Sequence, residues 1–197
     1  MQPRYFRPIS ITPVLSRSVE KYIFRSYIYP ALQEPTSGLY FADQFGFRPT
    51  GSTTAALIRY FPTILTMLST NPFVRVPALD FSKAFDTVRH TTLIDNMAQL
   101  QMPHHWVEAF FDGHSHCTNY SGEVSAYADI QASVIQGSGL EPAAYVVTAA
   151  DLRPKNDGDV LIKFADDTYM TLPAENSGTC IAELMHIDDW AEKPTSG

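Results

Sequence analysis

Three carboxylates stand where the sequence otherwise favours strands. Asp166 and Asp167 interrupt a run of apolar, aromatic and β-branched residues, LIKFADDTYM, and Asp80 lies near the end of a second strand-like run, FVRVPALDF. Adjacent like charges repel each other, and burying them without a partner costs far more. If the strand in FVRVPALDF ends at Asp80 and a hairpin turns at the aspartate pair, the three carboxylates meet at one edge of a sheet.

Converging carboxylates without a basic partner require a cation. Oxygen ligands of this kind select Mg²⁺ or Mn²⁺, and a bound cation keeps the acids ionised. A pair of such ions held by carboxylates is a widespread device for in-line phosphoryl transfer. The alternative is that the doublet only forms a solvated turn, as aspartates at a hairpin tip often do. Asp188 and Asp189 provide an internal comparison, because they lie in an amphipathic stretch and are expected to face water.

The elements that must position these carboxylates follow an irregular order, which predicts an α+β fold and argues against a doubly wound one. Ser52 is a good N-cap, Pro62 is expected to kink or split its helix, and Pro77 suggests an edge strand or a bulge. The predicted helices are 13–32, 52–69, 90–102, 104–113, 139–152 and 178–192, with a strand at 73–81, a hairpin within 117–134 and a strand-turn-strand at 159–172.

Composition indicates an ordinary globular protein, with 197 residues, 45% hydrophobic and 18% charged. The net charge of -7 is unusual for a free-standing nucleic-acid binder, because phosphates must be neutralised. Cys117 and Cys180 are interpreted as reduced thiols of an intracellular protein, in the nucleus or the cytoplasm. No apolar run reaches the roughly 18 residues of a membrane span, and the start lacks the apolar core of a signal peptide.

Five motifs in order resemble the reverse transcriptases of non-LTR retrotransposons of the jockey and LINE type. They are YFRPIS, QFGFRPTGST, LDFSKAFDTV, SVIQGSGLEP and FADD, and the resemblance runs from about Tyr5 to Trp190. It implies a right-hand polymerase fold with a palm, an antiparallel sheet with helices on one face, plus fingers and no thumb. Residues 1–73 are then expected to resemble fingers and 74–197 a palm, with 106–132 reaching back to the fingers.

The resemblance also implies an activity and a metal centre. The activity is RNA-directed DNA polymerisation, in which nucleotidyl transfer from a dNTP to the 3′-hydroxyl of a DNA primer copies an RNA template. Asp80, Asp166 and Asp167 would be catalytic and would bind two Mg²⁺ or Mn²⁺ ions, with the main-chain carbonyl of Phe81 as a further ligand.

Four more residues match substrate-binding positions of the family. Phe85 matches a steric gate that excludes a 2′-hydroxyl, and Gln136 and Gly137 match a turn that touches nucleotide and template. Arg7 matches an arginine that would clamp the triphosphate, a role suited to its planar cation.

Two residues remain ambiguous. Arg48 is either structural or template-facing, and Asp86 is interpreted as capping a helix or pairing with a base rather than binding metal.

The sequence also departs from the family pattern. Ile135 replaces the usual proline, and the thumb and flanking domains of a parent polyprotein are expected to be missing, which would leave the primer–template weakly held. The alternative is therefore a non-catalytic retrotransposon remnant with residual metal or nucleic-acid binding. A metal-dependent phosphohydrolase or phospho-acceptor domain is a third possibility, which the order of the strands disfavours.

Overall fold

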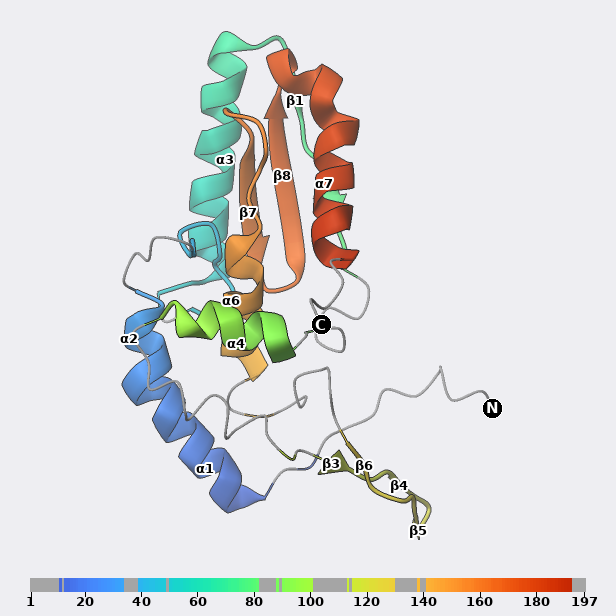
Figure 1. Ribbon diagram of the computed structural model, residues 1–197. Helices are drawn as coiled ribbons and strands as arrows, with labels where there is room; N and C mark the ends of the chain where they lie inside the picture. Colours follow the sequence, from blue (N-terminus) through green and yellow to red (C-terminus); the bar gives the residue numbers. More distant parts are fainter. Residues whose placement is uncertain are drawn as a thin grey trace.

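The centre of the molecule is an antiparallel sheet built around one long strand. The computed structural model describes residues 11, 13–33, 39–48, 50–81, 88, 90–100, 113, 115–129, 138 and 141–192. β8 (Asp167–Pro173) pairs along one side with β7 (Val160–Phe164) and along the other with two short strands, β1 (Val74–Arg75) and β2 (Ala78–Leu79). The helices lie outside this sheet, so the fold is α+β, as the order of the predicted elements indicated (Figure 1).

Pro77 divides the predicted strand 73–81 into two pieces. β1 and β2 both pair with β8, and Val76 and Pro77 interrupt the pairing between them. Proline has no N–H to donate, but its carbonyl still accepts a hydrogen bond from the Met170 amide at 3.1 Å. Within the described chain these pieces form the edge of the sheet, where proline is tolerated, and the prediction from Pro77 is confirmed.

Helices pack against both faces of the sheet. Met170 and Leu172 of β8 are buried in one cluster with Ile187 of α7 (Cys180–Glu192). Tyr169 points to the opposite face, where its ring lies 5.8 Å from that of Tyr60 in α3 (Thr53–Thr70). Figure 1 shows the sheet between these two helices. β8 presents large apolar or aromatic side chains on both of its faces. Because α3 belongs to the part expected to resemble fingers, the expected palm with helices on one face stays a prediction.

α3 begins where the sequence predicts and continues further than expected. The Ser52 hydroxyl accepts a hydrogen bond from the Ala55 amide at 3.0 Å, which confirms the N-cap. The helix is not split at Pro62, which lies inside the continuous span Thr53–Thr70. Pro62 lacks the N–H that would bond to the Ile58 carbonyl, and the neighbouring Thr63 hydroxyl donates to the Arg59 carbonyl at 2.7 Å.

A second apolar cluster joins the remaining helices. α1 (Val14–Ile23), a π-helical turn (Phe24–Ile28) and α2 (Tyr29–Ala31) run in sequence, and they lie near α4 (His90–Ala98) and α6 (Glu141–Thr148) (Figure 1). Asn96 of α4 is buried and donates to the Val147 carbonyl of α6 at 3.1 Å. This cluster holds α6 near the end of the sheet where the aspartate doublet lies. Two 3₁₀ turns, Ala149–Asp151 and Ala174–Thr179, follow α6 and β8.

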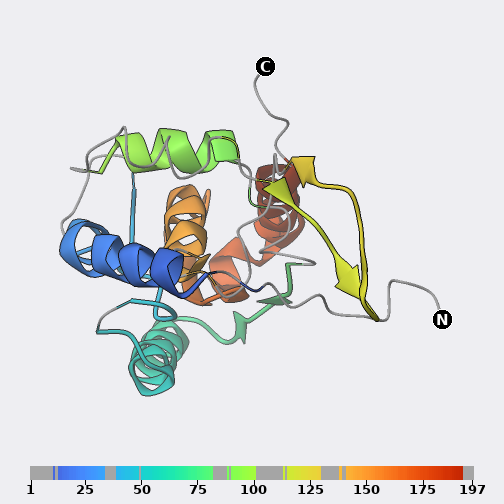
Figure 2. The ribbon, with the colours of Figure 1, turned by 90° about the horizontal axis from the view of Figure 1, so that it is seen from below.

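The predicted hairpin within 117–134 extends away from the helices (Figure 2). β4 (Asn119–Tyr120) pairs with β5 (Glu123–Val124), and β3 (Ser115–His116) pairs with β6 (Ala128–Asp129). The chain turns at Ser121 and Gly122, both with positive φ, so the hairpin prediction is confirmed.

Among the described residues, no helix is both long and apolar enough to cross a membrane.

Candidate active site

The pairing of β2 with β8 ends next to two of the predicted catalytic residues. Leu79 pairs with Thr168, Asp80 follows Leu79, and Asp167 precedes Thr168. The last printed pair of this antiparallel ladder is thus flanked by both aspartates, with Asp80 directly after one member and Asp167 directly before the other. Both residues are exposed. Two carboxylates from distant parts of the chain thus share one end of the sheet.

The third carboxylate lies in the adjoining turn. Phe164 pairs with Asp167, so Ala165 and Asp166 form a two-residue hairpin loop. Ala165 has φ +56°, whereas Asp166 does not have a positive φ. A positive φ at the first central residue alone is the pattern of a type II′ turn, where glycine is usual. The turn places Asp166 directly beside Asp167 at the hairpin tip.

Tyr145 is close enough to the aspartate doublet for the two negative charges to affect its pKa. This α6 residue is buried, and burial raises the pKa of its phenol above the ordinary value, with a further contribution from the negative charges of Asp166 and Asp167. In the described part of the chain, no ion pair or hydrogen bond engages the carboxylates of Asp80, Asp166 or Asp167. Their negative charge is therefore not neutralised by any described basic side chain.

This donor set fits a hard divalent cation in its chemistry, because it offers several exposed carboxylate oxygens without a basic partner. Among the described residues, however, no three His, Cys, Asp or Glu side chains gather into a group that could hold a metal ion. The assignment of metal ligands therefore stays a prediction. Phe81, whose carbonyl was expected to assist, packs its ring at 5.8 Å from that of Trp190.

Several predicted site residues fall outside the described part of the chain. They are Arg7, Phe85, Asp86, Gln136 and Gly137. Their predicted roles remain untested. The comparison pair Asp188 and Asp189 is described, and both residues are exposed on α7 as expected.

Arg48 binds main-chain carbonyls of nearby parts of the chain. Its guanidinium donates hydrogen bonds to the carbonyls of Phe41, Gln44 and Leu32, and it thereby ties the chain around residue 44 to the end of the first helical segment. These hydrogen bonds support the structural role, and a contact with template stays a prediction.

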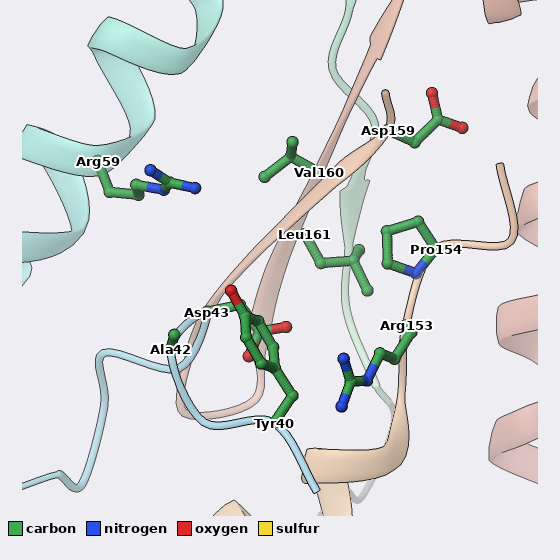
Figure 3. A pocket seen from close by; sticks show the side chains of 9 residues that line it. All are labelled: Tyr40, Ala42, Asp43, Arg59, Arg153, Pro154, Asp159, Val160 and Leu161. Atoms are coloured by element: carbon green, nitrogen blue, oxygen red, sulfur yellow. The ribbon is translucent and has the colours of Figure 1, made fainter. Parts of the chain in front are cut away.

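A cavity of about 190 Å³ lies beside β7 (Figure 3). Arg153 stacks over the ring of Tyr40 at 4.6 Å on one wall. The lining residues are Tyr40, Ala42, Asp43, Arg59, Arg153, Pro154, Asp159, Val160 and Leu161. Because none of the predicted catalytic residues contributes to it, this cavity is separate from the candidate active site.

Sequence reasoning missed the residues that support the aspartate turn from the side of β7. Lys163 is 1% exposed and its ammonium group pairs with Asp43 at 2.9 Å. Burial lowers the pKa of Lys163 and raises the pKa of Asp43, while the attraction between the two charges opposes both shifts. Gln44 is also buried and hydrogen-bonds Ala165. A lysine inside the apolar run LIKF was the available signal, because a buried charge requires a partner.

Comparisons with known proteins agree on one family. Residues 2–195 match the reverse transcriptase (RNA-dependent DNA polymerase) family. The chain is 29% identical to an RNA-directed DNA polymerase from mobile element jockey of Drosophila funebris, over 95% of this chain and 22% of that protein. It is also 29% identical to a probable RNA-directed DNA polymerase from transposon X-element of Drosophila melanogaster, over 98% of this chain and 22% of that protein. The chain thus spans about a fifth of the length of these curated relatives.

A solved structure supports the fold independently. The structure of apo telomerase from Candida tropicalis, truncated from its C-terminal domain, aligns with a TM-score of 0.55 and 12% sequence identity. The alignment covers 92% of this chain and 40% of that one. At this identity the likeness concerns the fold alone.

Proposed function

The chain belongs to the reverse transcriptase family, and on this premise we propose that it carries the catalytic centre of an RNA-directed DNA polymerase. The observation that supports the proposal is the register of β2 on β8, in which Leu79, just before Asp80, pairs with Thr168, just after Asp167, while Asp166 lies in the adjoining turn. The family uses divalent metal ions, and the three carboxylates are the ligands that we assign to them.

Asp80, Asp166 and Asp167 would hold two Mg²⁺ or Mn²⁺ ions together with the main-chain carbonyl of Phe81. When bound, such ions activate an attacking hydroxyl and offset the negative charge that develops on the phosphate. The chain itself would supply the alignment, because the pairing of Leu79 with Thr168 brings the backbone next to Asp80 and Asp167 together. An exposed sheet edge also leaves the carboxylates open to a primer end and a dNTP.

The substrate side of the proposal follows the family motifs. Arg7 would contact the triphosphate, Phe85 would exclude a 2′-hydroxyl, and Gln136 with Gly137 would contact the nucleotide and the RNA template. Residues 1–73 would act as fingers and 74–197 as palm, with 106–132 reaching back to the fingers. The contacts of α3 and of residue 44 with β7 support a close junction between these two parts.

Template-directed extension of a DNA primer on an RNA template tests this function. We expect Mg²⁺-dependent incorporation of dNTPs by the chain, with loss of incorporation in Asp80→Asn and Asp167→Asn. Asp188→Asn provides the matched control, since it removes an exposed carboxylate on α7. Equal incorporation by the two active-site variants and the control would overturn the proposal.

A non-catalytic remnant is the second candidate. It is favoured by the observation that no three metal-binding side chains converge among the described residues. In that case the extension assay gives no product with the chain at any divalent ion concentration, while the chain remains folded by circular dichroism.

A further inference from the structure

Residues 43–45 form a short segment that pairs with the free edge of β7 beside the aspartate turn. The Lys163 amide donates to the Asp43 carbonyl at 2.8 Å, and the Phe45 amide donates to the Lys163 carbonyl at 2.8 Å. Gln44 and Lys163 form a parallel bridge in this way. The segment therefore runs along the edge of β7 that β8 leaves free, and it reaches the end of β7 where the hairpin turns.

The Gln44 side chain binds both peptide groups of Ala165. Its Oε1 accepts a hydrogen bond from the Ala165 amide at 3.0 Å, and its Nε2 donates to the Ala165 carbonyl at 3.3 Å. The same Oε1 accepts from the Gly46 amide at 3.0 Å. Gln44 is 3% exposed, so these bonds do not compete with bulk water. One amide thus satisfies the backbone on both sides of the residue that precedes Asp166.

Ala165 needs such support because of its conformation. Its φ of +56° is unfavourable for a residue with a Cβ atom, and a residue holds this geometry only where its surroundings determine it. Gly46 allows the close approach, since a Cβ at this position would lie 2.2 Å from the Ala165 nitrogen. The glutamine and the glycine of the QFGFR motif therefore act together on the same turn.

The supporting segment is itself anchored. The Lys163 ammonium group donates to the carbonyls of Ala149 and Leu152 at 2.8 Å each, besides its pair with Asp43. On the other side, Arg48 donates to the Gln44 carbonyl. The backbone around Gln44 is thus fixed on one side by Arg48 and on the other by the Asp43–Lys163 pair.

We propose that Gln44 is a positioning residue for the catalytic carboxylates, whose amide holds Ala165 in the left-handed conformation and thereby sets the direction of Asp166 and Asp167. The role rests on the proposed function, because it assumes that these carboxylates bind metal ions. Because Gln44 is buried, this role does not require contact with the ions or the substrates. It acts through the backbone of the residue before the doublet.

Gln44→Met tests this role, because methionine keeps the length and volume of the side chain and removes all three hydrogen bonds. Gln99→Met is the matched control at an exposed glutamine. Hydrogen exchange of peptides covering 161–170 reports on the Ala165 amide, with a peptide from α7 as internal reference. Mn²⁺ titration followed by electron paramagnetic resonance reports on the carboxylates, and Asp166→Asn shows whether the binding occurs at the proposed centre.

We expect the Ala165 amide hydrogen to exchange at least about tenfold faster in Gln44→Met than in the unsubstituted chain. We expect its Mn²⁺ affinity to fall by about tenfold, as is common when the support of a ligand is removed. Adding Ala165→Gly should restore much of the affinity, because glycine adopts positive φ without help. A purely packing role of Gln44 predicts no such rescue.

The outcomes separate the two proposals. Unchanged exchange in Gln44→Met, unchanged Mn²⁺ affinity beside faster exchange, or absence of rescue by Ala165→Gly would each overturn the role of Gln44. If Gln44→Met does not fold, the double variant decides, and its failure to fold would also overturn that role. Mn²⁺ binding that Asp166→Asn leaves unchanged would instead overturn the proposed function, and the exchange measurement alone would then decide whether Gln44 holds the turn.

Discussion

At the scale of single residues, Tyr145 is buried in the apolar interior and its pKa responds to the charges of the aspartate doublet. Burial and the nearby negative charges raise the pKa of its phenol in the folded state. An unfolded tyrosine titrates near pH 10. The stability that this shift contributes is therefore complete below about pH 10 and is lost as the pH rises above it.

Tyr145→Phe is expected to flatten this part of the stability profile. Above about pH 10 the free energy of unfolding of the chain should fall by up to about 1.4 kcal/mol per pH unit more than that of the variant. Urea denaturation between pH 9 and 11 measures the difference, with Tyr127→Phe as a control at an exposed tyrosine. Parallel profiles for the chain and Tyr145→Phe would show that the raised pKa is absent.

The buried pair of Asp43 and Lys163 is the second feature at this scale. Both side chains are buried, so removing either partner leaves an uncompensated buried charge. We expect Lys163→Met and Asp43→Asn each to lower the free energy of unfolding by about 3–5 kcal/mol. The double variant should lose less than the sum, by about 1–3 kcal/mol, in a denaturant double-mutant cycle. Strict additivity would mean that the two charges do not interact.

At the scale of elements, the close contact between residues 43–46 and the β7–β8 hairpin controls the aspartate turn. Gly46 leaves no room for a side chain, because a Cβ would collide with the backbone of Ala165 and of Phe164. Either the segment or the turn would have to move. A substitution here therefore affects two elements that are far apart in sequence.

Gly46→Ala should destabilise the protein by about 1–3 kcal/mol, in the range of overpacked sites. Gly178→Ala is the matched control, since a Cβ there meets nothing within 4 Å and its φ is not positive. Thermal unfolding of the two variants measures the contrast. Equal midpoints for both would contradict the close contact.

The elements also show which features could be predicted from one sequence. Ser52 and Pro77 act through local backbone chemistry, so the helix start and the broken edge strand were predictable. The doublet at a hairpin tip was predictable because it lies between two strand-like runs. The bonds from Gln44 to Ala165 join residues 121 positions apart, and no periodic pattern records such a pair. Packing on both faces of β8 could not be predicted, because a run rich in apolar and aromatic residues fits a strand buried on one side or on both.

At the scale of the whole molecule, acidic residues outnumber basic ones, which gives a net charge of -7. Asp80, Asp166 and Asp167 add three negative charges to one end of the sheet, with no described basic partner. A bound cation would offset this negative charge, and the reverse transcriptase family uses divalent metal ions. Binding of a metal ion at this edge is therefore the central claim, because substrates and support residues matter only if it holds.

Calorimetric titration of the chain with Mn²⁺ tests this claim most directly. We predict saturable binding by the chain and by the control Asp188→Asn, and binding at least about tenfold weaker in Asp80→Asn and Asp167→Asn, a loss of about 1.4 kcal/mol or more. Equal affinity in all four proteins, or no binding by the chain, would contradict a metal centre formed by these carboxylates.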